Sequence, residues 1–251
     1  MLVYLWIRGF RVCADSGKKH AYWIKVGNAS KDPVIFCSGI GIGMNGYLKL
    51  INNLLFQYPN RTIILFETPC INLQPASSVL SKKDSLREVD DMFLALRLDK
   101  CTWFGHSYGT VIAGWVVKHR PDYISRLVLV DPVCFRVWDI SVYKTVFYST
   151  PDSLESSMFQ LIFASDPLLA CGILRCVNWF DTILFPEQIT MPTQIFIGLK
   201  DFLLDPTGLQ SYLQHRVTKD NLSHVEITTM DTFRGFFQLI PEFRERIFSV
   251  L

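Results

Sequence analysis

Short apolar runs separated by helical patterns constrain the fold of this chain more than any other feature. The runs lack a strict apolar and polar alternation, as is typical of strands covered on both faces of a sheet. They lie at residues 21–26, 34–37, 61–66, 101–104, 127–130, 193–198 and 225–230. Apolar residues at helical spacing lie at 47–56, 84–96, 110–119, 207–216 and 241–250. This order predicts a mostly parallel central sheet with crossover helices on both faces, in one α/β domain of residues 1–251.

The strand pattern stops between residues 133 and 190. Helical segments with aliphatic and aromatic stripes take its place, as at 154–163 and 168–177. We predict that residues 133–190 form a helical cap inserted into the α/β domain. The stripes fit two interpretations equally, the wall of a pocket for an acyl or other apolar ligand and ordinary packing core.

Composition argues against several classes of protein. The 251 residues carry a net charge of +2 without a basic stripe, so a nucleic-acid partner is not expected. The seven cysteines are scattered, and no C-x-x-C pair or nearby histidine completes a zinc site. We expect reduced, mostly buried thiols in an intracellular, cytoplasmic protein without a metal or a cofactor. The sequence carries no signal for an oligomeric state.

The amino-terminal run Met1–Ile7 is apolar and is followed at once by Arg8. Seven residues are too few to cross a bilayer, and the run lacks the basic start and cleavage site of a signal peptide. We predict that this run forms an edge strand of the sheet. Membrane contact through the same segment is the less favoured alternative.

A glycine-rich turn, Gly105–Gly109, joins the run at 101–104 to the helical pattern at 110–119. A Gly-x-Ser-x-Gly pattern between a strand and a helix is typical of a nucleophile elbow, whose sharp turn lifts a serine hydroxyl above the sheet. The glycines let the strand and the helix pack closely beside the strained turn. We predict Ser107 as the nucleophile, and we expect His106 to pack beneath the turn rather than act as the base.

A second glycine-rich loop, Ser38–Gly43, follows the apolar run at 34–37. In acyl transfer, backbone N–H groups stabilise the negative charge on a carbonyl oxygen, and they come from the residue after the nucleophile and from such a loop. We predict Tyr108 as one donor and Ile40 or Gly41 as the other. A phosphate-binding loop is less favoured, because the glycine spacing departs from the dinucleotide fingerprint and no Lys-Ser/Thr pair follows.

These motifs together resemble the α/β-hydrolase family, and the resemblance covers nearly the whole chain. The elbow Gly105–Thr110 and the segment Asp131–Phe135 are similar to those of fungal-type members. The segment Arg175–Phe180 resembles an Arg/aromatic/Trp patch in the helical cap of that group. The resemblance implies an esterase-, lipase- or amidase-like reaction on an acyl ester or a related small molecule. It also implies an acid in a Gly-x-x-Asp pattern, which Asp201 fits.

Two further aspartates are alternatives for that acid. Asp205 precedes Pro206 and is expected to be a turn residue. Asp131 ends the apolar run at 127–130, where we expect it to cap a helix. Asp201 therefore stays the predicted acid.

The catalytic histidine is the main departure from the family pattern. The resemblance places it after the last strand, in a His-Gly-x-Phe segment, where this chain has Arg234 before Gly235. Arginine stays protonated at any useful pH, so Arg234 cannot take the proton of Ser107. We expect Arg234 to pair with Asp201 or to hold a ligand carboxylate or phosphate, and an exposed side chain without a role is the plain alternative.

The other histidines are poorly placed to act as a base. His224 begins the last strand and so lies at the far edge of the sheet. His119 and His215 end helices, and His20 lies in the amino-terminal turn region. No histidine occurs between residues 133 and 190.

Two functions of different classes remain open. The first is a serine hydrolase of ester or amide bonds that uses Ser107, Asp201 and a base that the sequence does not reveal. The second is a catalytically inactive binding or regulatory protein, a pseudoenzyme that kept the pocket. The family resemblance favours the first function, and the missing histidine favours the second. Hydrolase-family function is our working prediction.

Overall fold

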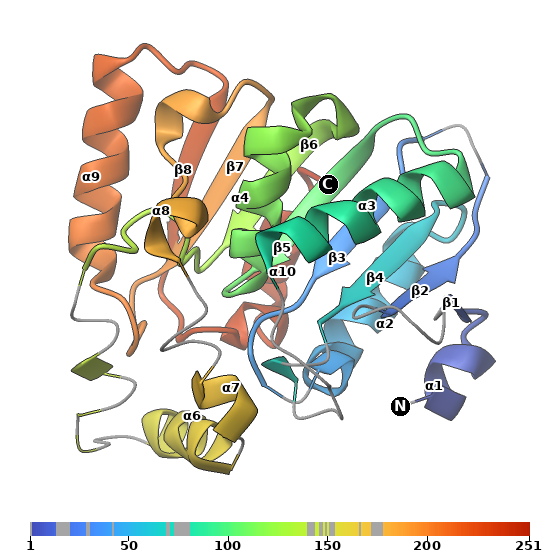
Figure 1. The fold of residues 1–251 in the computed structure, drawn as a ribbon, viewed down its shortest axis with the longest axis horizontal. Coiled ribbons are helices and arrows are strands. Elements are labelled where there is room, and N and C mark those ends of the chain that lie inside the picture. Colours follow the sequence, from blue (N-terminus) through green and yellow to red (C-terminus); the bar gives the residue numbers. More distant parts are fainter. Residues whose placement is uncertain are drawn as a thin grey trace.

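The computed structural model describes residues 2–13, 21–28, 31–41, 43–68, 71–72, 81–139, 144–145, 148, 150, 154–165, 167–171 and 178–251. Its strands are β1 Arg11–Cys13, β2 Ala21–Lys25, β3 Val34–Cys37, β4 Ile63–Glu67, β5 Cys101–His106, β6 Ile124–Val130, β7 Thr193–Gly198 and β8 Val225–Met230. They form one sheet in the order β1-β2-β4-β3-β5-β6-β7-β8 (Figure 1). The pairs β1–β2 and β2–β4 are antiparallel, and the other pairs are parallel. The predicted mostly parallel sheet is therefore confirmed.

Helices surround this sheet. Those described are α1 Leu2–Ile7, α2 Leu48–Gln57, α3 Lys82–Leu96, α4 Gly109–His119, α6 Leu154–Ser165, α7 Pro167–Cys171, α8 Trp179–Thr182, α9 Pro206–Lys219 and α10 Pro241–Phe248. Short 3₁₀ helices lie at Gly43–Tyr47, Pro121–Tyr123, Pro186–Gln188 and Phe236–Gln238. Figure 1 shows α3, α4 and α9 in front of the sheet and α10 behind it. None of the described helices has the length and apolar character needed to cross a bilayer.

Both faces of the sheet are buried, each against its own apolar cluster. Successive residues of a strand point to opposite faces, so Trp103 joins one cluster and Phe104 joins the other. The first cluster includes side chains of α3, α4 and α9, and the second includes side chains of α2 and α10. Burial on both faces explains why the strands read as continuous apolar runs.

The amino-terminal run was predicted to be an edge strand, and this prediction is wrong. Residues Leu2–Ile7 form the helix α1, and Leu5 is buried in the second apolar cluster. The edge beside β2 is taken by β1, where Arg11 pairs with Ile24. The periodicity of a short apolar run fits a helix and a strand equally well. Here β1 already pairs with the edge of β2, and the amino-terminal run is helical.

The interval between β6 and β7 contains the helices α6, α7 and α8, and its described residues include no strand. Along α6 the predicted apolar stripe is divided, because Leu154, Met158 and Leu161 are exposed while Phe159 packs against the core. The patch predicted at Arg175–Phe180 lies outside the described residues up to position 177. The assignment of residues 133–190 as an inserted cap stays a prediction.

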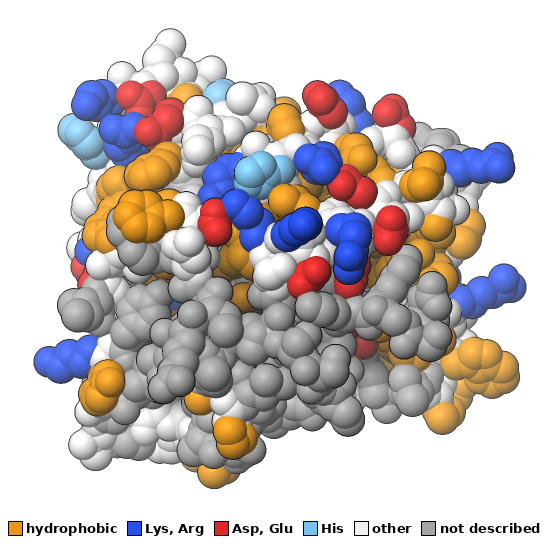
Figure 2. Space-filling model, viewed as in Figure 1, with side chains coloured by type: hydrophobic (Ala, Val, Ile, Leu, Met, Phe, Trp, Pro, Cys, Tyr) orange, Lys and Arg blue, Asp and Glu red, His pale blue; other side chains and the backbone are white. Residues whose placement is uncertain are grey.

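Charges of both signs are interspersed on the face shown in Figure 2, among the described residues that it colours. Lys82 pairs with Asp181 at 2.5 Å, and Arg120 pairs with Asp90 at 2.7 Å. These pairs link α3 to α8 and to the end of α4.

The start of α4 packs directly against the backbone of β3. A methyl group added at Gly109 would lie 2.1 Å from the carbonyl oxygen of Cys37, which is far inside van der Waals contact. Gly114, one turn and a half further along the same helix, has its nearest neighbour at 3.6 Å, on the side chain of Leu184. Close packing therefore requires glycine at position 109 but not at position 114.

We expect Gly109→Ala to lower the free energy of unfolding by at least about 2 kcal/mol, because helix and strand must separate to admit the methyl group. Gly114→Ala is the matched control in the same helix. It should stay within about 1 kcal/mol of the wild type, on the stabilising side, because alanine favours helix. Urea denaturation of the three proteins measures both effects, and equal losses at the two positions would contradict this account of the packing.

Candidate active site

Ser107 occupies the sharp turn between β5 and α4, at the carboxyl edge of the sheet. Its φ of 52° is left-handed, a conformation that costs a non-glycine residue about 1–3 kcal/mol and persists only where neighbours hold it. Its N–H donates to the carbonyl of Val130 at 3.0 Å. Its carbonyl accepts from the N–H of Thr110 at 2.9 Å and from the hydroxyl of Thr110 at 2.6 Å. This is the strained geometry predicted for the elbow.

Arg234 lies in the turn after β8 and reaches the serine. Its Nη1 donates to Ser107 Oγ at 3.0 Å and to the carbonyl oxygen of Asp131 at 2.9 Å. Its Nε donates to Asp201 Oδ1 at 2.9 Å, and its Nη2 donates to Asp201 Oδ2. The side chains of Arg234 and Asp201 are 5% and 2% exposed, so the pair is removed from solvent. An exposed Arg234 is therefore excluded, and the ion pair with Asp201 is the arrangement found.

The charge of Arg234 is fixed by this environment. Burial alone would lower the pKa of its guanidinium, but the carboxylates of Asp201 and Asp131 outweigh burial and raise that pKa above its ordinary value. Arg234 therefore donates hydrogen bonds to Ser107 and cannot accept the serine proton. Among the described residues, no imidazole lies within hydrogen-bonding distance of Ser107 Oγ.

Asp131 was expected to cap a helix, and this prediction is wrong. The carboxylate is buried and accepts from the N–H of Gly198 at 2.9 Å and from the N–H of Gly235 at 3.0 Å. Gly198 ends β7, three residues before Asp201, and Gly235 directly follows Arg234. Asp131 lies at the end of β6, beside the loops that follow β7 and β8. Its carboxylate therefore accepts from N–H groups of these loops and not from the free end of a helix. Asp131 thus ties together the two loops that carry Asp201 and Arg234.

The pKa of Asp131 is lowered although burial acts to raise it. The hydrogen-bonding contact with His106, the charge of Arg234 and the N–H of Gly235 all favour the ionised form. His106 Nε2 lies 3.5 Å from Asp131 Oδ2, a long contact between two buried groups. Asp131 is therefore a buried anion in the folded protein.

His106 packs beneath the elbow, as predicted, and takes part in a polar chain that the sequence did not reveal. The hydroxyl of Tyr47 accepts from the N–H of Gly39 at 2.9 Å and lies 2.6 Å from His106 Nδ1. The hydroxyl proton of Tyr47 is free to bond to Nδ1, and in that tautomer the ring proton is on Nε2, facing Asp131. No local pattern marks Tyr47, because its partners lie on other elements.

The loop predicted to supply an oxyanion donor lies against the elbow. A methyl group at Gly39 would lie 2.8 Å from Ser107 Cβ, so only glycine allows this approach. The N–H of Gly41 donates to the carbonyl of Ile71 at 3.1 Å, so Ile40 is the better of the two predicted loop donors. Tyr108, the other predicted donor, precedes the first turn of α4.

The remaining candidates lie elsewhere. Asp205 begins α9, where its carboxylate accepts from the N–H of Gly208 at 3.0 Å. His224 precedes β8 and contacts the carbonyl of Ile189 at the amino edge of the sheet. Within the described residues no cluster of three or more His, Cys, Asp or Glu side chains is suited to a metal ion. The cysteines whose side chains are described, Cys13, Cys37, Cys101 and Cys134, are free thiols.

Comparison with known proteins agrees with this architecture. A family model described as alpha/beta hydrolase fold matches residues 32–146, from the end of the loop before β3 to beyond the elbow. A hydrolase from Pseudomonas aeruginosa superposes with a TM-score of 0.67 at 15% identity, covering 96% of this chain and 97% of that one. Naproxen esterase from Bacillus subtilis superposes with a TM-score of 0.70 at 10% identity, covering 98% and 95%. The chain has the α/β-hydrolase fold.

Two relatives of this α/β-hydrolase-fold chain are more similar in sequence. Karrikin insensitive 2 receptor B from Petunia hybrida is 21% identical over 245 residues, covering 85% of this chain and 88% of that protein. The sn-1-specific diacylglycerol lipase ABHD11 from Danio rerio is 26% identical over 105 residues, 42% of this chain and 33% of that protein. These likenesses extend to proteins with esterase and lipase activities.

The lowered pKa of Asp131 predicts how stability depends on pH. A carboxyl group whose pKa is depressed on folding stabilises the protein above its ordinary value of about 4, and this contribution is lost as the pH falls through the folded pKa. Asp131→Asn should lower the free energy of unfolding at neutral pH by about 2–4 kcal/mol, since a glycine N–H loses its acceptor and Arg234 loses a counter-charge. Its stability should also vary less than that of the wild type between about pH 5 and pH 3.

Asp231→Asn is the control for this measurement, because the Asp231 side chain is 69% exposed and pairs with Lys200 on the surface. It should change the free energy of unfolding by less than about 1 kcal/mol and leave the acid profile unaltered. Denaturant titrations across this pH range test both variants. A wild-type acid profile in Asp131→Asn would show that Asp131 is not a buried anion.

Proposed function

We propose that this protein binds a small carbonyl- or carboxylate-bearing ligand at Ser107 without turning it over as an esterase does. The observation that carries the proposal is the guanidinium of Arg234, which donates to Ser107 Oγ at 3.0 Å and pairs with buried Asp201. An acyl transfer needs a base at the place that this guanidinium occupies. The elbow is thus retained as a binding element.

The loss of a base has a large expected effect on rate. In serine proteases, removal of the triad histidine lowers turnover by about six orders of magnitude, and the residual catalysis comes from oxyanion donors and binding. Arg234 also removes electron density from the serine oxygen by donating to it. Both effects keep Ser107 a poor nucleophile.

The same groups can bind an oxygen atom of a ligand. Arg234 Nη1 uses its two N–H groups on Ser107 Oγ and the carbonyl oxygen of Asp131, so the donor left for a ligand is the proton of the Ser107 hydroxyl, beside the loop that holds Gly39 and Ile40. A hydroxyl donor beside a guanidinium charge suits the oxygen of an ester, a lactone or a carboxylate. The proposed ligand is therefore a small molecule with one such oxygen.

An aromatic contact lies directly after Asp201 in the chain. Phe202 follows Asp201, and its ring lies 5.4 Å from that of Phe159 on α6. This contact supports the proposal that residues 133–190 act as a cap over the site. It also favours a ligand with an acyl or other apolar portion next to its polar oxygen.

The names of the relatives are consistent with either binding or turnover. One relative is a receptor, and others are an esterase and a diacylglycerol lipase. A shared fold does not distinguish binding from turnover, so the distinction rests on the residues of the site.

Serine hydrolysis is the second candidate, with Ser107 as nucleophile, Asp201 as acid and Tyr108 and Ile40 as oxyanion donors. The strained φ of Ser107 favours it, because such strain is commonly held at reacting groups. It requires a base that is not among the described contacts of Ser107.

Arg234→His separates the two candidates. We expect the wild type to resist a fluorophosphonate probe and to hydrolyse p-nitrophenyl acetate no faster than Ser107→Ala. An imidazole between Ser107 and Asp201 should raise Ser107-dependent hydrolysis by at least about a hundredfold, the range of general-base catalysis. Labelling and esterase rates of the purified variants measure the change.

Arg234→Gln is the matched control, because it removes the charge without introducing a base. It should stay inactive, which would show that the gain in Arg234→His comes from the imidazole and not from loss of the ion pair. Labelling of the wild type that disappears in Ser107→Ala would refute the binding proposal and support the hydrolase.

A further inference from the structure

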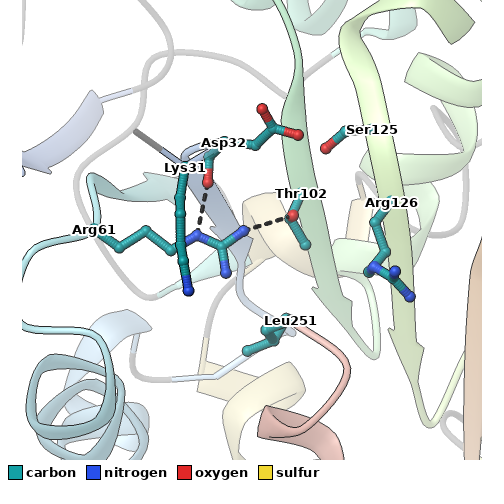
Figure 3. Close-up of a pocket in the computed structure, with 7 residues that line it drawn as sticks. All are labelled: Lys31, Asp32, Arg61, Thr102, Ser125, Arg126 and Leu251. Atoms are coloured by element: carbon teal, nitrogen blue, oxygen red, sulfur yellow. Dashed lines mark hydrogen bonds between the residues drawn. The ribbon is translucent and has the colours of Figure 1, made fainter. Parts of the chain in front are cut away.

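A polar cavity lies at the amino edge of the sheet (Figure 3). Ser107 follows the carboxyl end of β5, at the opposite end of the strands. Its volume is 380 Å³. The polar side chains that line it are Lys31, Asp32, Arg61, Thr102, Ser125 and Arg126. They come from the first residues of β5 and β6 and from the segments just before β3 and β4. Leu251 completes the lining. The lining side chains therefore include three cations and one carboxylate.

A shift in strand register brings two of these side chains into the cavity. Cys101 pairs with Ile124, and the next residue, Thr102, pairs with Arg126. Ser125 is left opposite no partner, as the extra residue of a β-bulge. In a regular strand Ser125 and Arg126 would face opposite sides of the sheet. Here both line the same cavity, beside Thr102 of the neighbouring strand (Figure 3).

Arg61 supplies a buried positive charge on the other side of Thr102. The residue is 7% exposed, and its Nε donates to the carbonyl oxygen of Asp32 at 2.6 Å. Its Nη2 donates to Thr102 Oγ1 at 2.9 Å. These acceptors are uncharged, and Arg61 forms no ion pair with any described residue. Burial correspondingly lowers the pKa of Arg61.

Unused hydrogen-bonding capacity borders the cavity as well. The hydroxyl oxygen of Ser125 is buried and has no partner among the described residues. Thr102 Oγ1 accepts from Arg61, so its own proton is available to a further acceptor. Arg61 donates only to uncharged acceptors, and the Asp32 carboxylate acts on it without a direct ion pair. A buried hydroxyl without a partner, such as that of Ser125, is costly unless a ligand satisfies it.

We propose that this cavity binds the phosphate group of a small organic phosphate. Guanidinium groups match the geometry of phosphate oxygens, and the hydroxyls of Ser125 and Thr102 supply further donors. A cavity of 380 Å³ has the size of small-molecule sites and leaves room for an organic portion beyond the phosphate itself. Its position at the amino edge makes this binding independent of the oxygen site at Ser107.

Calorimetric titration of the full chain with glycerol 3-phosphate and with inorganic phosphate tests the proposal. We expect both to bind, with glycerol 3-phosphate at least as tight. Arg126→Gln should weaken binding by at least about tenfold, the loss of one charge-assisted hydrogen bond. Ser125→Ala should weaken it by a smaller factor. Arg126 is only part-buried, so its variant should remain folded, as thermal unfolding will show.

Two controls locate the binding. Arg87→Gln removes an exposed charge on α3 and should leave the affinity unchanged. Arg234→Gln removes the cation beside Ser107 and should also leave it unchanged. Thermal unfolding is measured for this variant too, and loss of binding in folded Arg234→Gln would assign the phosphate to the other site and overturn the proposal.

A phosphate monoester can also belong to a lipid headgroup, so vesicles of phosphatidylcholine with phosphatidic acid form a separate arm. Co-sedimentation with these vesicles, without binding of glycerol 3-phosphate, would overturn the proposal of a soluble ligand. So would the absence of heat with either phosphate at millimolar concentration, or an unchanged affinity in Arg126→Gln.

Discussion

The buried ion pair between Arg234 and Asp201 is the interaction on which the candidate site depends. A guanidinium is tolerated in a protein interior only when counter-charges and acceptors surround it. Asp201 binds it through two oxygens, and Ser107 Oγ and a carbonyl oxygen accept its remaining contacts. The buried guanidinium of Arg234 therefore donates to the Ser107 hydroxyl, which in a serine hydrolase would be hydrogen-bonded to a base. The stability of the site and its lack of a proton acceptor have the same cause.

Asp131 positions the loops that carry the Arg234–Asp201 pair. It accepts from the loops after β7 and β8, and it faces His106, whose other nitrogen contacts Tyr47. Tyr47 in turn binds the N–H of Gly39, in the loop that approaches the elbow. A single buried carboxylate thus connects the segments that carry Asp201, Arg234 and the predicted oxyanion donor. Networks of this kind specify one arrangement because each unsatisfied member would be costly.

The two edges of the sheet have different chemistry for a topological reason. At the carboxyl edge, loops from three parallel strands converge on the turn at Ser107. At the amino edge, the bulge at Ser125 places Ser125 and Arg126 in the lining of the cavity that Arg61 also lines. Because the strands between them are buried on both faces, the two sites lie on one rigid element and at opposite ends of it.

By itself, the sequence determined the sheet, its crossover helices and the elbow, because strand and turn signals repeat over a few residues. The same short range misled the prediction at α1 and gave no sign of Tyr47, of the bulge at Ser125 or of the role of Asp131. The identity of Arg234 already excluded a base in the histidine position. Only the tertiary structure decided that Arg234 joins Ser107 and Asp201, which lie 127 and 33 residues away. Contacts over such separations depend on how loops meet at a sheet edge, and no local pattern encodes that meeting.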